Sequence, residues 1–141
     1  MISDLLLRLW HISQQRLRAA LDKVTPENAR YRPTPRTASA GFIFRHVAET
    51  QLLLAKLLLG TEAELALFTR RANDEGRVIP LEDIRDLMQL SAEKVSQRIS
   101  ETEEEYWTEL LENQFGIPDR IGAVAFLIHH SMYHTGRLLK P

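Results

Sequence analysis

The chain of 141 residues is 44% apolar and 26% charged, which fits one domain, residues 1–141, that can bury a hydrophobic core. Its formal net charge of -1 excludes the strongly basic character typical of nucleic-acid binding, so we expect no nucleic-acid partner. The sequence has no cysteine, no apolar stretch of membrane-spanning length and no secretory signal pattern at its N-terminus, so we expect a cytoplasmic protein with no disulfides and no membrane partner.

Apolar residues at three- and four-residue steps predict helices along the chain, and no sustained two-residue alternation predicts a strand. The first helix is predicted from about Ser3 to Lys23, before the prolines between positions 26 and 35 interrupt helical structure. Its predicted core-facing stripe comprises Ile2, Leu5, Leu6, Leu9, Leu17, Ala20, Leu21 and Val24.

A second helix is predicted after Ser39, a favoured N-cap residue, and is expected to end at Gly60, which can adopt the left-handed conformation. Its predicted core-facing residues are Phe42, Ile43, His46, Leu53, Leu54 and Leu57. The end of this helix, QLLLAKLLLG, is apolar around nearly its whole circumference, whereas a bundle helix needs only one apolar stripe. A short neighbouring helix or a second subunit must therefore cover the remaining leucines, and the second alternative predicts a homodimer; these leucines are Leu52, Leu58 and Leu59.

Two short helices are predicted from capping-box spacing. Thr61 and Glu64 have this spacing, which predicts a short helix to about Arg71. Thr102 and Glu105 repeat it, and the acidic residues beside them suit the positive end of a helix dipole. We assign the acidic run no functional role.

Two more long helices complete the predicted architecture. The third begins after Pro80, and the fourth begins with Pro118 at its first helical position. Four long helices, with two long connections at roughly residues 24–38 and 60–80 and short extra helices, predict an all-α four-helix bundle whose order need not be simple up-down-up-down. The predicted core-facing residues of the third helix are Ile84, Leu87, Met88, Val95 and Ile99.

Histidines lie on the apolar stripe of the last helix. Ala123, Leu127, His130 and His134 follow steps of four and three, with Leu138 completing the stripe. Side chains four residues apart on a helix can converge on a single ion, which is why HxxxH recurs at metal sites. His46 is the best third candidate because it lies on the apolar stripe of the second helix.

Two interpretations of these histidines stay open at this point. A metal ion shared by His46, His130 and His134 would satisfy all three side chains, whereas separate hydrogen bonds would make them ordinary core histidines. His11 and His129 lie off the stripes, and we expect each of them either at the surface or in contact with one of the candidate ligands without binding the metal itself.

Two segments resemble the DinB/YfiT-like family. RYRPTPRTASAGFIFRHVAE is similar to the family's proline-containing loop that leads into a histidine-bearing helix. HHSMYHTGRL resembles the family's C-terminal HxxxH signature, although Arg137 stands where glutamine is usual. The resemblance implies a four-helix bundle that binds a divalent metal, usually zinc or nickel, through His46, His130 and His134. Its characterised relatives include transferases and isomerases that use low-molecular-weight thiols such as bacillithiol or mycothiol.

Two functions are therefore considered. In the first, a metal-dependent transferase or hydrolase acts on a small molecule with a small thiol or an activated water, because a bound divalent cation lowers the pKa of either one. Arg137 and Tyr133 are then candidates for substrate binding, Arg137 through an anionic group; the alternatives are a solvated arginine and a core tyrosine. In the second, the chain is a non-catalytic dimeric bundle, a binding or stress-related module with structural histidines.

Overall fold

The computed structural model is all-α in the part of the chain that it describes. Four long helices pack together, and one short 3-10 helix precedes the last of them. The predicted fold class is thus confirmed. The described residues are 1–32, 34–64, 67–69, 73–76 and 78–139, of which 137–139 are described by their backbone alone.

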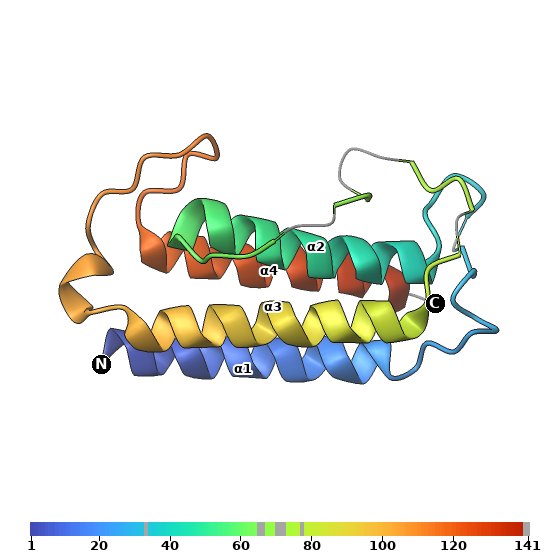
Figure 1. Ribbon diagram of the computed structural model, residues 1–141, viewed down its shortest axis with the longest axis horizontal. Coiled ribbons are helices and arrows are strands. Elements are labelled where there is room, and N and C mark those ends of the chain that lie inside the picture. Colours follow the sequence, from blue (N-terminus) through green and yellow to red (C-terminus); the bar gives the residue numbers. More distant parts are fainter. Residues whose placement is uncertain (33, 65–66, 70–72, 77, 140–141) are drawn as a thin grey trace.

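The helices are α1 (Ile2–Leu21), α2 (Ala40–Leu59), α3 (Leu81–Glu101), η1 (Glu104–Tyr106) and α4 (Arg120–Leu139). In Figure 1, α1 and α4 run towards the right-hand end of the bundle, and α2 and α3 run away from it. The order is therefore up-down-down-up. Among the described helices, none combines the length and the hydropathy that a membrane-spanning segment needs.

In cross-section, the four helices occupy the corners of a square. Both α1 and α2 pack against α3 and α4, so α1 and α2 lie at opposite corners. Because α2 and α3 run in the same direction, the chain between them must return along the length of the bundle (Figure 1). The antiparallel pair α2 and α4 positions the candidate site.

Both predicted ends of α2 are confirmed. The Ser39 side chain accepts a hydrogen bond from the Phe42 N–H at 3.3 Å, and this bond satisfies one of the free donors at the helix start. Gly60 has a φ of 72°, the left-handed conformation in which a side chain would be strained.

The short helix predicted from Thr61 is wrong wherever it can be checked, because residues 61–64 and 67–69 are not helical. The remaining positions of that prediction lie outside the described residues. The backbone N–H groups of Phe68 and Thr69 donate to the Glu49 carboxylate on α2 rather than to preceding carbonyls. This tertiary partner replaces the hydrogen bonds that a helix would supply.

The predicted cap at Thr102 is also wrong. Thr102 is instead the residue at which α3 ends, with an extended backbone and its hydroxyl donating to the Arg98 carbonyl, and η1 begins after Glu103 without a side-chain cap. Glu104 instead accepts the Ile2 N–H at 2.8 Å and pairs with the N-terminal amine, so the acidic run stabilises the start of α1. With only η1 inside it, 102–119 is a third long connection.

The last helix begins two residues later than predicted, at Arg120 rather than Pro118. Asp119 performs the capping, since its side chain accepts the Gly122 N–H at 2.8 Å and its carbonyl accepts the Ala123 N–H.

The predicted stripe of α1 is rotated relative to the observed one. Leu5 and Leu9 are 58% and 44% exposed, whereas Trp10 is fully buried. The Trp10 indole N–H donates to the Ala92 carbonyl of α3, and this contact places the large ring in the core. On α2, Leu57 is likewise exposed.

The leucine-rich end of α2 is buried within a single chain. Leu52, Leu58 and Leu59 are all at most 3% exposed, because a helix at one corner of the square contacts two neighbours and buries two faces. Their burial removes the argument for a dimer that rests on these leucines. The homodimer itself stays a prediction, for light scattering over a concentration series to test.

The core consists of two apolar clusters with polar side chains between them. One cluster is built around Trp10 and Trp107, and the other around Phe44 and Met88. Between the clusters lies one buried polar side chain from each long helix, a set that we call the glutamine layer: Gln14, Gln51, Ser91 and Ser131.

Candidate metal centre

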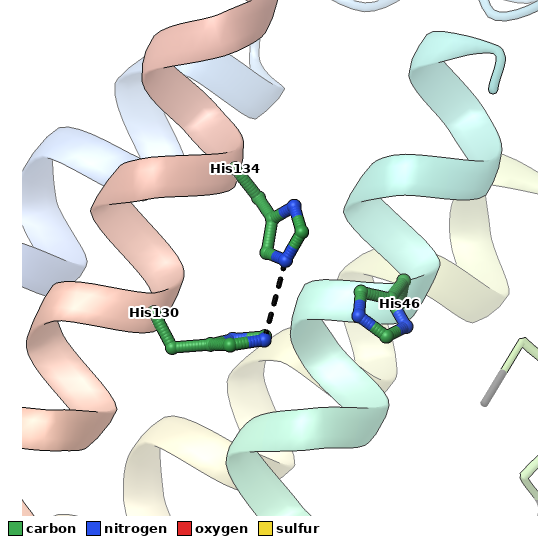
Figure 2. Close-up of side chains that lie close together, drawn as sticks. All are labelled: His46, His130 and His134. Carbon is green, nitrogen blue, oxygen red and sulfur yellow. Dashed lines mark hydrogen bonds between the residues drawn. The ribbon is translucent and has the colours of Figure 1, made fainter. Parts of the chain in front are cut away.

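The three predicted ligands come together on facing helices. His46 lies near the start of α2, and His130 and His134 lie one turn apart on α4. Figure 2 shows the three imidazoles converging from the two helices. Each side chain is partly buried, so the cluster lies at the edge of the bundle rather than in its centre.

The distances between the rings fit a single small ion. One nitrogen from each of His46, His130 and His134 lies within 4.8 Å of the others. The Nε2 atoms of His130 and His134 are 3.2 Å apart (Figure 2). Two nitrogens bound to a tetrahedral zinc lie about 3.3 Å apart, given a bond length of about 2.0 to 2.1 Å. This pair is already at that separation.

Burial keeps two of the three imidazoles, those of His46 and His130, neutral. Burial, followed by the proximity of His134, His46 and His129, lowers the pKa of His130 to about 4. Burial also lowers the pKa of His46, although the negative charge of Glu49 opposes the shift. Neutral imidazoles have the free lone pairs that metal binding requires.

Hydrogen bonding within the cluster is incomplete. His130 Nδ1 is buried without a hydrogen-bond partner, and its Nε2 faces the Nε2 of His134. In neutral imidazoles at least one nitrogen is a bare acceptor, so this pair can share at most one hydrogen bond. Three converging imidazole nitrogens are a donor set that suits zinc, nickel, copper or iron. The residues present therefore fit a divalent metal ion.

The other histidines lie apart from the cluster. His11 is exposed and its Nε2 lies 3.2 Å from the Ser96 hydroxyl. His129 is also exposed, and its ring stacks on Tyr133 with the centroids 6.3 Å apart. Neither belongs to the group that could hold a metal.

Of the two residues predicted to bind substrate, the structure describes the side chain of Tyr133 but not that of Arg137. Tyr133 is 56% exposed and presents its ring to the edge of His134, with the centroids 5.5 Å apart, so it is not a core residue. Arg137 follows His134 on α4, but its side chain lies outside the described residues.

Three residues near the cluster were not predicted from the sequence. The Thr69 hydroxyl lies 3.4 Å from His46 Nδ1, and Arg45 and Glu49 form a buried ion pair on α2. Two opposite charges four residues apart, on a largely apolar helix and on either side of His46, were a signal in the sequence for a buried ion pair. Nothing local in the sequence connects Thr69 with His46.

A four-helix bundle with three histidines converging from two adjacent helices defines the class of protein: an all-α domain with a cluster that could bind a divalent metal. The particular family follows from comparison of its sequence. The chain belongs to the DinB superfamily, whose sequence profile matches residues 9–138 and so covers all three histidines. No curated protein matches the chain. The family resemblance predicted from the two sequence segments is confirmed.

Proposed function

We propose that the protein binds one divalent metal ion per chain through His46, His130 and His134, and acts as a metal-dependent transferase or hydrolase. The observation that carries the proposal is the convergence of three imidazole nitrogens within 4.8 Å of one another. The lowered pKa values of His46 and His130 support it, because both ligands are then neutral at pH 7. Zinc and nickel are the expected metals.

When bound, the cation would lower the pKa of a coordinated water or thiol and so supply a nucleophile near neutral pH. The three histidines would hold the ion through one nitrogen each and would leave room for a small ligand. Because the chain contains no cysteine, any reactive thiol must come from a low-molecular-weight cosubstrate.

Two residues of α4 would orient the substrate. The exposed Tyr133 lies beside His134, and its phenol is proposed to hydrogen-bond a small molecule at the cluster. Arg137, which follows on the same helix, is proposed to bind an anionic group of the substrate. These roles predict that Tyr133→Phe and Arg137→Gln raise KM more than they reduce metal affinity.

Metal analysis of the purified protein tests the proposal. We expect about one zinc or nickel ion per chain in the wild type and in His11→Ala, and far less in His130→Ala. His11 is a matched control because it is an exposed histidine away from the cluster. Equal metal contents in wild type and His130→Ala, after reloading with zinc or nickel, would overturn the metal site.

A second assay separates an enzyme from a binding module. The metal-loaded protein is incubated with a low-molecular-weight thiol and an electrophilic small molecule, and with ester substrates for the hydrolase reaction. We expect turnover that a chelator removes and added metal restores. Stoichiometric metal without turnover would favour the non-catalytic alternative.

A further inference from the structure

A buried ion pair lies next to the histidine cluster on α2. Arg45 donates from Nε to Glu49 Oε2 at 2.8 Å, and the Glu49 side chain is only 2% exposed. A buried charge is tolerated only when it is paired and hydrogen-bonded. Glu49 meets this condition through a further set of donors outside α2.

These donors are the backbone N–H groups of residues 68–69, in the connection between α2 and α3. Glu49 Oε1 accepts the Phe68 N–H at 2.9 Å and the Thr69 N–H at 3.1 Å. The Arg45 guanidinium also lies over the Phe68 ring, 4.5 Å from its centroid. Since residues 67–69 form no helix or strand, these contacts hold them against α2.

The anchored segment carries a hydroxyl to the back of one candidate ligand. Thr69 is 2% exposed, and its Oγ1 lies 3.4 Å from His46 Nδ1. When His46 Nδ1 carries the proton, it donates a long hydrogen bond to this oxygen and Nε2 keeps its lone pair; in the other tautomer the hydroxyl would donate to Nδ1 and Nε2 would carry the proton. Figure 2 shows the His46 ring directed towards His130 and His134.

We propose that Glu49 and Thr69 are positioning residues for the metal centre. Glu49 anchors residues 68–69, and the Thr69 hydroxyl then holds His46 in the tautomer and the orientation that bind metal through Nε2. This inference rests on the proposed metal site. Glu49 is not itself a ligand, because its carboxylate lies outside the group that could hold an ion and both its oxygens already accept hydrogen bonds.

Groups behind a ligand affect the ligand's geometry and basicity, and losing one costs about 10- to 100-fold in metal affinity. The Thr69 contact is long, so its removal is expected to have an effect at the lower end of that range. Loss of Glu49 frees the whole segment and is expected to have the larger effect.

The test compares Thr69→Val with Thr69→Ser. Valine keeps the branched shape but lacks the hydroxyl, whereas serine keeps the hydroxyl. In a Zn²⁺ titration against a chelator, we expect Thr69→Val to bind about tenfold more weakly and Thr69→Ser to stay within about twofold of wild type. The matched control is Thr61→Val, which removes a buried hydroxyl without a hydrogen-bond partner from the same connection.

A second readout needs no metal. In nitrogen-15 NMR spectra of the metal-free protein, His46 is expected to be the Nδ1–H tautomer in wild type and Thr69→Ser, and a mixture of tautomers in Thr69→Val. An unchanged tautomer together with unchanged Zn²⁺ affinity in Thr69→Val would overturn the role of Thr69. If wild type itself binds no Zn²⁺, the proposed function fails, while the tautomer still decides whether Thr69 positions His46.

Glu49 is tested with a variant chosen to keep the fold. Glu49→Gln leaves Arg45 buried without its counter-charge, so the double variant Arg45→Met with Glu49→Leu, which replaces both charges by apolar groups, accompanies it. We expect both to keep a helical circular dichroism spectrum and to lose more than about tenfold in Zn²⁺ affinity. A folded double variant with wild-type affinity would overturn the role of Glu49.

Discussion

Two groups of polar side chains lie among the four helices, and they differ in whether their hydrogen bonding is complete. In the glutamine layer, Gln14 and Ser131 both donate to the Gln51 side-chain oxygen, and the Gln51 amide donates to Ser91. In the histidine cluster, His130 Nδ1 has no partner and the imidazole nitrogens face one another. The hydrogen bonds of the layer are complete, whereas the cluster contains a buried nitrogen without a partner and two Nε2 atoms that face each other.

The glutamine layer and the histidine cluster can be compared directly on α4, where Ser131 of the layer follows His130 of the cluster in the sequence. Ser131 faces the centre of the bundle and is fully buried, whereas His130 faces α2 at the bundle edge and is partly buried. A complete buried network rigidifies a fold, whereas imidazole nitrogens that face one another present lone pairs that a cation can bind. The two groups are therefore expected to respond to mutation in opposite ways.

The largest expected effect is on the glutamine layer. Gln51→Leu removes the acceptor of both Gln14 and Ser131, so we expect the free energy of unfolding to fall by about 4 kcal/mol, or about 2 kcal/mol for each orphaned donor. Urea denaturation measures this change. Gln89→Leu, on the exposed face of α3, is the control and is expected to stay within about 0.5 kcal/mol. Equal stabilities for the two variants would contradict a structural role for the layer.

The opposite response is expected at the histidine cluster. His130→Leu removes one ligand and a buried unpaired nitrogen, so Zn²⁺ affinity is expected to fall by more than about 100-fold, the upper limit for groups behind a ligand. The free energy of unfolding of the metal-free protein is expected to stay the same or rise by about 1 kcal/mol. Calorimetric titration and urea denaturation measure the two quantities. A large loss of stability would make the cluster structural, like the layer.

The metal-free protein is expected to lose stability in acid through the cluster and not through the uncharged layer. The pKa of His130 is about 4 in the folded chain and about 6.5 in an unfolded one, so the unfolded chain binds more protons between these values. The free energy of unfolding therefore falls as the pH falls through this window, by an amount on the order of 1 kcal/mol. Urea denaturation at pH 7 and pH 4.5 measures it, and His130→Leu is expected to show a smaller pH dependence.

The smallest effect is expected outside both groups. His11→Ala changes an exposed side chain on α1, so its free energy of unfolding is expected to stay within about 0.5 kcal/mol of wild type. Its Zn²⁺ affinity is expected to be unchanged. A loss of Zn²⁺ affinity in this variant would mean that binding is not confined to the cluster.

Much of the candidate site was predictable because its spacing is local. His130 and His134 meet through the repeat of one helix, and the apolar stripe around them indicated which way they face. Their approach to His46 depends on α2 and α4 being antiparallel neighbours, which no local pattern specifies. The sequence indicated His46 only through its place on the apolar stripe of α2 and through the resemblance to the DinB/YfiT-like family. Thr69 was not predictable, because its place depends on hydrogen bonds to Glu49 from another part of the chain.

The sequence by itself determined the four helices, the cap at Ser39, the turn at Gly60 and the HxxxH stripe, because these depend on side chains within a few residues of one another. Only the tertiary structure decided which face of α1 is buried, where Trp10 replaces Leu5 and Leu9, since rotation of a helix depends on the fit of large side chains against its neighbours. It also decided that residues 67–69 are not helical, because the buried Glu49 carboxylate on α2, 19 residues earlier in sequence than Phe68, accepts the backbone N–H groups of Phe68 and Thr69 in place of helix carbonyls.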